Sequence, residues 1–345
     1  MSDSMKNFII SFLCVALTVN LCAQKKKYIK RNKNASRYSY AGNSIYARGL
    51  YADSNLLFIG NSDGAIYYLN LDKEKSELIF KLPELNEIRD IEKSGNHLIG
   101  MHSGDNGALI LLEKNGELNI LKNKEWEGVF LDGMDFFNER GFMMGDPVNG
   151  KFGLFHSDDS GFTWSKCQGT VTAHNGEAGF AASGTNVQVL NDSTYVFVTG
   201  GEMSRFFKST DNGISWTQVV LPYYPGKSIG AYSICFANDS IGVIVGGDYK
   251  DPELGMNTCF YTKDGGRSWL NAIETVRGYR SCVYYSNKVF YACGRNGIDF
   301  SLDGGIEWIP FANGTYYSLT SNNGKLIAST KNGSVIFFDL IQPKE

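Results

Sequence analysis

The sequence lacks the motifs by which most metal and cofactor sites are identified. Its 345 residues include only four histidines, and these show no metal-ligand spacing. There is no G-x-S-x-G nucleophile motif, no phosphate-binding loop and no dinucleotide fingerprint. We therefore expect no metal and no cofactor. The four histidines are His97, His102, His156 and His174.

The sequence also lacks an excess of positive charge. It has 33 Lys and Arg against 36 Asp and Glu, a formal net charge of −3, which argues against nucleic acid as the main partner. Proline is rare, with 7 residues, whereas there are 39 glycines and 13% of the residues are aromatic. This composition favours many short β-strands joined by tight turns.

The apolar run near the N-terminus is too short for a stable membrane span. With a translation start at Met5, the run covers residues 8–19 and is followed by Ala23, a small residue suited to a cleavage site. This pattern is typical of a cleaved secretory signal. We expect residues 1–23 to be removed, leaving no transmembrane segment, in a protein that is secreted or lies in the periplasm or cell envelope. The alternative is a lipoprotein anchored at Cys22, although the preceding Val-Asn-Leu lacks the small residue expected there.

Cysteine does not form a disulfide framework. Cleavage after residue 23 leaves an odd number of cysteines, and none has CxxC spacing. If Asn287 and Lys288 form a two-residue turn, Cys282 and Cys293 face each other across a hairpin, either as a bridge or as buried free thiols. The remaining cysteines are Cys167, Cys235, Cys259, Cys282 and Cys293.

What the sequence does contain is one phrase repeated four times, Ser/Thr-x-Asp-x-Gly-x-x-Trp. In each repeat the Asp carboxylate is expected to accept hydrogen bonds from its own tight turn, together with the Ser or Thr hydroxyl. Gly supplies the positive φ of the turn, and Trp starts the next strand with a buried ring. A single carboxylate is too poor a ligand set for Ca²⁺, so each repeat is interpreted as a structural staple. The repeats contain Asp159 and Trp164, Asp211 and Trp216, Asp264 and Trp269, and Asp303 and Trp308.

The phrase resembles the Asp-box, or BNR repeat, of sialidase-like β-propellers. The arginines at the starts of inner strands, as in Ile88-Arg89-Asp90-Ile91, make the chain most similar to propellers of the photosystem II stability/assembly-factor type. That resemblance implies an envelope propeller that binds a protein or glycan partner.

Counting the repeats predicts a seven-bladed β-propeller with four-stranded antiparallel blades. Degenerate versions of the box occur around positions 72, 115 and 339, which gives seven units spaced by 36 to 53 residues. The last unit lacks an outer strand, and we expect the segment from Tyr28 to Lys33 to supply it and close the ring. Residues 24–345 are therefore predicted to form a single domain. A six-bladed ring is the alternative.

The longest loops are predicted to share one face of the ring, opposite the box turns. They include insertions at 145–150 and 247–256 and the connections 170–179 and 222–226. Polar and aromatic loops that converge on the mouth of the central channel form the predicted binding site.

Aligning the starts of the inner strands places charged and aromatic residues around this mouth. Arginine suits bidentate capture of carboxylate or phosphate, so the expected ligand is anionic. The alternative is that these are ordinary channel-lining residues, paired with one another and solvated. The predicted ligand-binding residues are Arg48, Arg89, Asp132, Asp146, Arg205, Tyr232, Asp248, Arg280 and Tyr317, and Ser183 is the equivalent position in the fourth blade.

The sequence leaves open a glycan-active enzyme, either a sialidase-like hydrolase or a polysaccharide lyase. Resemblance to sialidases implies an arginine triad, a Tyr nucleophile activated by Glu, and an Asp acid/base. The corresponding candidates are Tyr317, Glu177 or Glu202, and Asp90. The family's early Phe/Tyr-Arg-Ile-Pro motif is absent, and sialidases have six blades. A Tyr nucleophile requires a carboxylate within hydrogen-bond reach of Tyr317 or Tyr232.

Overall fold

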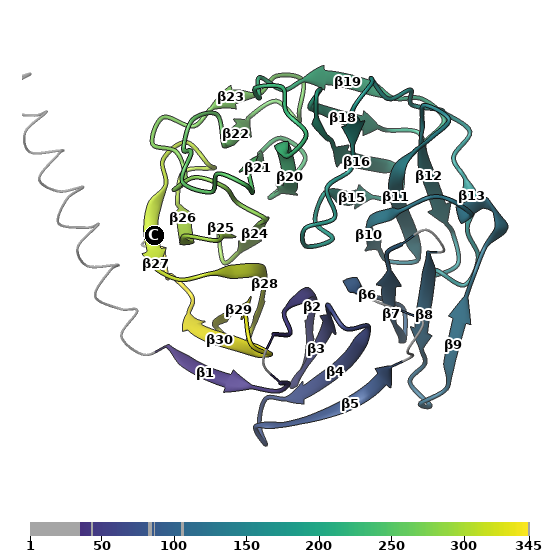
Figure 1. The fold of residues 1–345 in the computed structure, drawn as a ribbon, viewed down its shortest axis with the longest axis vertical. Coiled ribbons are helices and arrows are strands. Elements are labelled where there is room, and N and C mark those ends of the chain that lie inside the picture. The colour runs from purple at the N-terminus through teal and green to yellow at the C-terminus, as the bar shows by residue number, and fades with distance from the viewer. Residues whose placement is uncertain (1–34, 43, 82–84, 86, 105–106, 344–345) are drawn as a thin grey trace, which may run out of the picture.

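Seven antiparallel sheets surround a central channel in the computed structural model (Figure 1), which describes residues 35–42, 44–81, 85, 87–104 and 107–343. Six sheets have four strands, and the fifth blade is extended by two short extra strands. The predicted fold class, an all-β seven-bladed propeller, is confirmed. Among the described residues, no helix has the length and apolar character needed to span a membrane.

Each of the first three blades is a meander of consecutive strands. Their elements are β2 (Ala47–Asp53), β3 (Leu56–Asn61), β4 (Ala65–Asn70) and β5 (Lys75–Lys81); β6 (Ile88–Ser94), β7 (His97–His102), β8 (Ala108–Leu112) and β9 (Leu118–Leu121), followed by the 3-10 helix η2 (Lys124–Trp126); and β10 (Leu131–Phe137), β11 (Arg140–Val148), β12 (Lys151–Ser157) and β13 (Ser165–Lys166).

Blades four to seven follow the same order, except at two places. Strands β14 (Glu177–Ala178) and β17 (Gly200–Gly201) join the fifth blade, and the outer strand of the seventh is β1 (Ser36–Ser39). The other elements are β15 (Val187–Asn191), β16 (Thr194–Val198), β18 (Arg205–Ser209) and β19 (Thr217–Val220); β20 (Ile229–Phe236), β21 (Gly242–Asp248), β22 (Cys259–Thr262) and β23 (Leu270–Asn271); β24 (Cys282–Ser286), β25 (Val289–Gly294), β26 (Gly297–Ser301) and β27 (Ile309–Ala312); and β28 (Tyr316–Asn322), β29 (Lys325–Thr330) and β30 (Ser334–Asp339).

The ring is closed by the pairing of β1 with β30, which lie side by side in Figure 1. The register runs from Ser36 opposite Phe337 to Ser39 opposite Ser334. The segment from Tyr28 to Lys33, which the sequence favoured for this strand, lies outside the described residues, as does the predicted signal at 1–23.

The core lies between neighbouring blades rather than at the centre of the ring. Between blades two and three, for example, buried Met101, Trp126, Met134, Phe155 and Trp164 form one cluster. Burying side chains on both faces of each sheet removes apolar surface from water, which stabilises the fold by about 25 cal/mol per Å². The blades are therefore fixed by their neighbours, and the inner strand ends are left to form a site.

The four repeated boxes form the turns between the third and fourth strands. In the third blade, Asp159 accepts the Thr163 amide on Oδ1 at 2.9 Å and its hydroxyl on Oδ2 at 2.6 Å. The Ser157 hydroxyl accepts the Gly161 amide at 2.8 Å, and Gly161 has φ 87°. The indole of Trp164 is buried and donates to the Gly161 carbonyl. Each box therefore staples its own hairpin and contributes an aromatic ring to the blade interface.

Hydrogen bonding lowers the pKa of three box carboxyls, those of Asp159, Asp211 and Asp264. The Asp264 carboxylate accepts hydrogen bonds from the Ser268 hydroxyl, which has the larger effect, and from the Ser268 amide. Because these bonds favour the charged form, the pKa of Asp264 falls to about 2. A depressed folded-state pKa contributes stability above the unfolded value near 3.8, and that contribution is lost as the pH falls through about 2. We expect the Asp264 carboxyl to titrate near 2 in a ¹³C NMR titration, and Ser268→Ala to move it toward 3.8. Titration of the unsubstituted protein near 3.8 would contradict this assignment.

The hairpin of the sixth blade has the turn expected from its sequence. Asn287 and Lys288 have φ values of 51° and 62°, which identifies a two-residue turn with both central residues left-handed. Cys282 lies directly opposite Cys293 in the register. Both thiols are fully buried, and neither forms a disulfide with a described residue.

Candidate functional site

In most blades the inner strand has a β-bulge near its start, where one residue of the inner strand has no opposite residue on the neighbouring strand. The bulges fall at Arg48, Arg89, Asp132 and Tyr232, and the seventh blade has its extra residue between Tyr316 and Leu319. A bulge turns a side chain away from the regular alternation of the strand. Here it places the extra side chain at the channel mouth.

These residues line one pocket of about 360 Å³ at the mouth, here called the mouth pocket. Six predicted ligand-binding residues lie in it, namely Arg48, Arg89, Asp132, Asp146, Tyr232 and Tyr317. The other lining residues were not among the predicted ligand-binding residues. Tyr249 lies in the insertion 247–256, which was predicted to face the mouth, whereas Arg295 comes from a turn of the sixth blade that was not. The remaining lining residues are Phe130, Gly179, Phe180, Ala181, Ala182, Tyr279, Ser281 and Tyr316.

Arg280 does not lie at the mouth, so the alignment was wrong in the sixth blade. The Ser281 amide donates to the Cys293 carbonyl, and Cys293 lies opposite Cys282 in the strand register. Ser281 therefore immediately precedes the first paired residue of its inner strand, as Arg48 precedes Gly49 in the first blade. Arg280 precedes it and is 0% exposed. Arg205 and Asp248 also lie outside the mouth pocket, and Asp248 caps its own loop by accepting the Lys250 amide at 2.9 Å.

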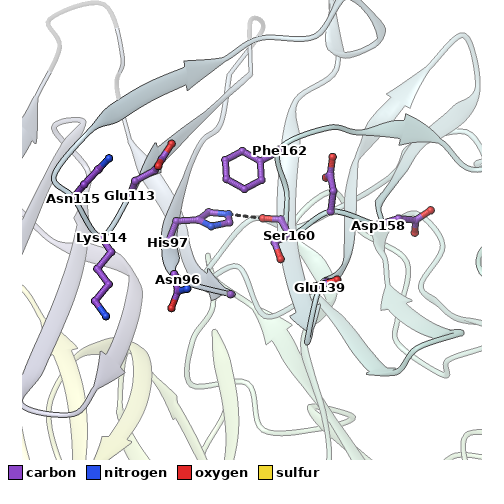
Figure 2. Close-up of a pocket in the computed structure, with 11 residues that line it drawn as sticks. Asn96, His97, Glu113, Lys114, Asn115, Glu139, Asp158, Ser160 and Phe162 are labelled. Atoms are coloured by element: carbon purple, nitrogen blue, oxygen red, sulfur yellow. Dashed lines mark hydrogen bonds between the residues drawn. The ribbon is translucent and has the colours of Figure 1, made fainter.

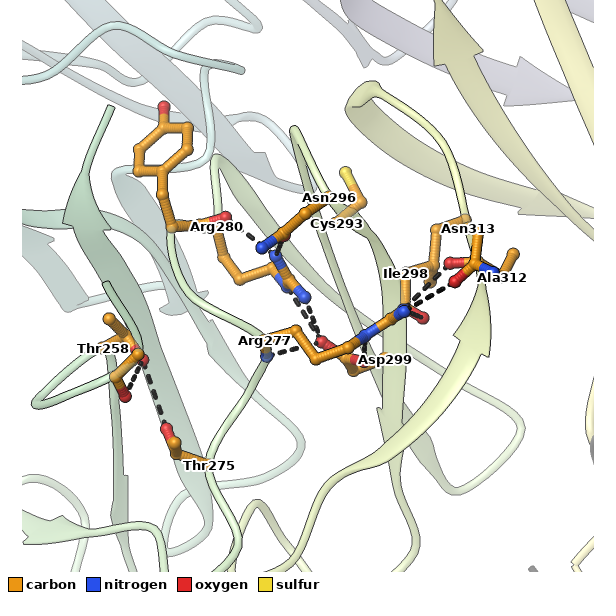
Figure 3. Close-up of polar contacts among 12 residues, drawn as sticks. Thr258, Thr275, Arg277, Arg280, Cys293, Asn296, Ile298, Asp299, Ala312 and Asn313 are labelled. Carbon is orange, nitrogen blue, oxygen red and sulfur yellow. Dashed lines mark hydrogen bonds and ion pairs between the residues drawn. The ribbon is translucent and has the colours of Figure 1, made fainter. Parts of the chain in front are cut away.

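Arg280 instead belongs to a buried ion cluster at one end of the sixth blade (Figure 3). Asp299 accepts Arg280 on Oδ2 and the side chain of Arg277 on Oδ1, the latter at 2.6 Å. Arg280 also donates to the Tyr279 carbonyl at 2.8 Å and to Asn296. Burial lowers the pKa of Arg280, and Asp299 opposes that effect. The cluster joins strands of the blade and is structural.

Glu177 and Arg205 form a second buried ion pair. Glu177 Oε1 accepts Arg205 Nε at 2.9 Å, and Oε2 accepts Arg205 Nη2 at 2.5 Å. The Thr199 hydroxyl and the His174 amide complete the shell of the carboxylate, at 2.6 and 2.9 Å. With its side chain 0% exposed, Glu177 anchors the long connection into the fourth blade and is not available as a catalytic base.

Beyond Glu177 the chain crosses the channel as an irregular segment, residues 179–185, here called the plug. Its carbonyls at Ala181 and Ala182 accept Arg89 at 2.6 Å and Arg48 at 2.9 Å. The ring of Phe180 stacks on Tyr232 at 4.3 Å between centroids. The plug thereby contacts the first, second and fifth blades at once.

The other end of the plug is fixed by small residues. The Ser183 hydroxyl donates to the Ser281 carbonyl at 2.8 Å, and the Thr185 and Ser233 hydroxyls lie 2.6 Å apart. Gly184 has φ 75°, and a Cβ there would lie 2.2 Å from the Asp90 carboxyl. Only glycine fits that position without strain.

Below the plug the channel contains a second chamber of about 420 Å³, which shares no lining residue with the mouth pocket. Asp90, Glu92 and Asp135 line it. Burial raises the pKa of each carboxyl, that of Asp135 to about 7. Asp90, a candidate acid/base, therefore faces this chamber rather than the mouth. Among the described residues, no group of three or more His, Cys, Asp or Glu could hold a metal.

The two arginines held by the plug keep part of their hydrogen-bonding capacity. Arg48 lies over the Tyr46 ring at 5.1 Å, and Arg89 lies over Phe130 at 5.3 Å and pairs with Glu87. Their Nε groups are buried without a hydrogen-bond partner among the described residues. Burial, followed by the proximity of Arg48, lowers the pKa of Arg89. The plug thus orients two guanidinium groups, of which Arg89 is also paired with Glu87.

Of the two mouth carboxyls, that of Asp132 is buried and that of Asp146 is half-buried. Asp132 is 1% exposed, and neither of its oxygens makes a hydrogen bond of normal geometry with a described residue. Burial and then Asp146 raise its pKa well above the usual range, opposed by Arg89 and the Ala181 amide. Asp146 accepts the Gly179 amide at 2.8 Å, and burial raises its pKa as well.

Neither mouth tyrosine has the partner that a nucleophile requires. Tyr232 donates to the Ser228 carbonyl at 2.8 Å, and Tyr317 packs on Tyr46 at 5.1 Å. Burial raises the pKa of both phenols. Among the described residues, no carboxylate hydrogen-bonds to either hydroxyl, and Glu202, the other candidate base, is exposed outside the mouth pocket. This geometry lends no support to Tyr-based glycosidase chemistry.

A wider hollow of about 650 Å³ lies on the box-turn side, between blades two and three (Figure 2). His97 projects into it from the start of β7, bonds to the Ser160 carbonyl and packs on Phe162 at 4.4 Å. These contacts attach the box turn of one blade to its neighbour, which explains a buried histidine here without a ligand.

No family model and no curated protein matches the chain. Among solved structures it is similar to selenomethionine-substituted virginiamycin B lyase from Staphylococcus aureus, with 12% identity and a TM-score of 0.66, covering 89% of this chain and 99% of that one. It is also similar to the WD40 β-propeller domain of Doa1, with 10% identity and a TM-score of 0.61, covering 88% of this chain and 97% of that one. The computationally designed Ika8 protein is 13% identical with a TM-score of 0.53, and the match covers 88% of this chain and 99% of that one. At these identities the likeness shows the seven-bladed propeller fold alone.

Proposed function

We propose that this propeller binds an anionic group of a protein or glycan partner in the mouth pocket, as a binding or assembly scaffold of the cell envelope. A propeller fold is consistent with a binding or scaffold role in general. The Asp-box turns and the predicted secretory signal support the envelope setting, within the Asp-box propellers that the repeats resemble.

One observation carries the proposal: three arginines and several aromatic rings converge on a single concave pocket. Arg48 and Arg89 are positioned by plug carbonyls, and Arg295 lies 5.8 Å over the Tyr249 ring. The pocket also holds Asp132 and Asp146, whose raised pKa values disfavour their negative forms. The electrostatic balance of the pocket therefore favours an anion.

The experiment is binding of the purified protein to an array of carboxylated, sulfated and neutral glycans together with acidic peptides. We expect anionic probes to bind, with an affinity that falls as salt is added. Replacing Arg48, Arg89 and Arg295 together by Ala removes three charge-assisted contacts of roughly 1.5–3 kcal/mol each, so we expect a loss of at least about 100-fold.

The matched control is Arg267→Ala, which removes one exposed arginine from a box turn on the opposite face. It is expected to leave binding unchanged, and thermal unfolding would verify that the triple variant is folded. A folded triple variant that binds as tightly as the unsubstituted protein would overturn the proposal.

A further inference from the structure

Two arginines of the mouth pocket lack an acidic partner among the described residues. Arg48 is held by one plug carbonyl, and Arg295 lies over the Tyr249 ring at 5.8 Å. Neither guanidinium forms an ion pair with that part of the chain, whereas Arg89, the third arginine of the pocket, pairs with Glu87. A guanidinium without a counter-ion in a concave site is a strong donor for an oxyanion. The anion is therefore expected beside Arg48 and Arg295.

Two phenol hydroxyls lie beside the same guanidiniums. Tyr279 is 6% exposed and Tyr317 is half-buried, and both line the mouth pocket. Neither hydroxyl makes a hydrogen bond with a described residue, and both keep accessible surface in the pocket. Burial raises the pKa of each phenol, and Arg48 and Arg295 oppose that rise in both. Each hydroxyl thus lies near both positive charges, stays protonated and can donate to a bound group.

These donors come from three consecutive blades around the channel. Arg48 lies at the start of β2, Tyr317 lies in β28, and the first hairpin of the sixth blade has Tyr279 before it and Arg295 after it. Strand β28 contacts both β2 and β24, so the seventh blade lies between the other two (Figure 1). A group that enters along the channel axis therefore meets donors from several directions. The two oxygens of a carboxylate lie in one plane, whereas a phosphate or sulfate monoester presents three oxygens around its axis.

The opposite side of the pocket suits the rest of the ligand rather than the anion. Asp132 and Asp146 come from the third blade and bring no positive charge. Phe180 stacks on Tyr232 at 4.3 Å between centroids, and both rings line the pocket. The chamber below the plug shares no lining residue with the pocket, which is therefore closed at its base. The anionic group is thus an end or a side group of the ligand.

We infer that the mouth pocket takes the tetrahedral end group of a phosphate or sulfate monoester. Its three terminal oxygens accept hydrogen bonds from Arg48, Arg295, Tyr279 and Tyr317. This inference rests on the proposed function, whose anionic group it identifies. The two esters share their shape and their number of terminal oxygens, so the experiment has an arm for each.

Calorimetry of the full chain with four probes that differ only at carbon 6 tests this inference: D-glucose 6-phosphate, D-glucose 6-sulfate, D-glucuronate and D-glucose. At pH 7 the sulfate ester and the carboxylate carry the same charge, so this pair compares shape alone. We expect at least one ester to bind about tenfold or more tightly than glucuronate, and glucose not to bind. The tighter of the two esters identifies the source of the group.

Tyr279→Phe removes one hydroxyl and keeps the ring. Losing a hydrogen bond to a charged group is expected to weaken binding of the tighter ester about tenfold, and binding of glucuronate less, because two oxygens need fewer donors. The matched control is Tyr224→Phe, which makes the same change at a tyrosine that is 54% exposed and outside the pocket lining. It is expected to change neither affinity.

The order of affinities in the unsubstituted protein decides the question if Tyr279→Phe does not fold. Glucuronate bound as tightly as both esters overturns this inference and leaves the anion site intact. A folded Tyr279→Phe variant that binds the esters as the parent does also overturns it. Failure of all three anionic probes, with acidic peptides bound on the array, overturns the ester class alone, whereas failure of the probes and of the array overturns the proposed function as well.

Discussion

Replacing Asp299 by alanine is expected to lower the free energy of unfolding by about 3–5 kcal/mol, because it leaves a buried guanidinium without its counter-ion. Arg280 is fully buried, and Asp299 accepts it through both Nε and Nη2. The same carboxylate accepts the backbone amide of Arg277 at 3.0 Å. Urea unfolding followed by tryptophan fluorescence measures the loss.

Two further variants show whether the loss comes from the uncompensated charge. Asp192→Ala removes an exposed aspartate and is expected to stay within about 0.5 kcal/mol of the parent. The double variant Arg280→Met/Asp299→Leu replaces both charges by apolar groups and is expected to lose less than Asp299→Ala alone. A single variant as stable as Asp192→Ala would show that the cluster in Figure 3 contributes little.

Glu177→Ala is the second substitution with a large expected effect, and it links stability to the site. The change leaves Arg205, whose side chain is 4% exposed, without its counter-ion. It also removes the acceptor for the Thr199 hydroxyl and the His174 amide. We expect a loss of about 3–5 kcal/mol in unfolding free energy. Because the plug begins two residues after Glu177, we also expect weaker anion binding at the mouth, measured by calorimetry.

Glu202→Ala is the matched control, since Glu202 is exposed and lies in the same blade connection region. It is expected to change neither quantity measurably. If Glu177→Ala lost stability but bound anions as the parent does, the plug would be held by its contacts with Arg48 and Arg89 alone.

The architecture could be predicted from the sequence because the repeats are local. Each box contains its own turn, staple and core ring, from Ser157 to Trp164 in the third blade. Counting boxes and their degenerate versions gives seven blades, and the structure confirms that number. The outer strand of the last blade could not be located in the same way, because a short exposed edge strand such as Ser36–Ser39 has no distinctive pattern.

The site was only partly predictable, because its geometry depends on single-residue shifts. One extra residue in a strand decides which side chain faces the channel. In the sixth blade Ser281 lines the mouth pocket in place of the predicted Arg280, although the local sequence resembles that of other blades. Asp132 and Tyr232 were placed at the mouth because their bulges follow the common register. Arg295 lies in a tight turn where neither spacing nor composition marks it.

The plug was the largest feature without a sequence signal. Residues 179–185, with the sequence Gly-Phe-Ala-Ala-Ser-Gly-Thr, take the place of the regular inner-strand start in the fourth blade and show no strand periodicity. Their position follows from contacts made by distant residues, above all Arg48 and Arg89. A prediction from neighbouring residues alone cannot include such contacts.

The pairing of β1 with β30 has a consequence for the order in which the protein assembles. Ser36 meets Phe337, so the last sheet stays incomplete until nearly the whole chain has been synthesised. Until β30 has been synthesised, β1 has no partner strand, and closing so long a loop is slow. A nascent chain would therefore hold six finished blades and one exposed edge, the state most open to mispairing with a second chain.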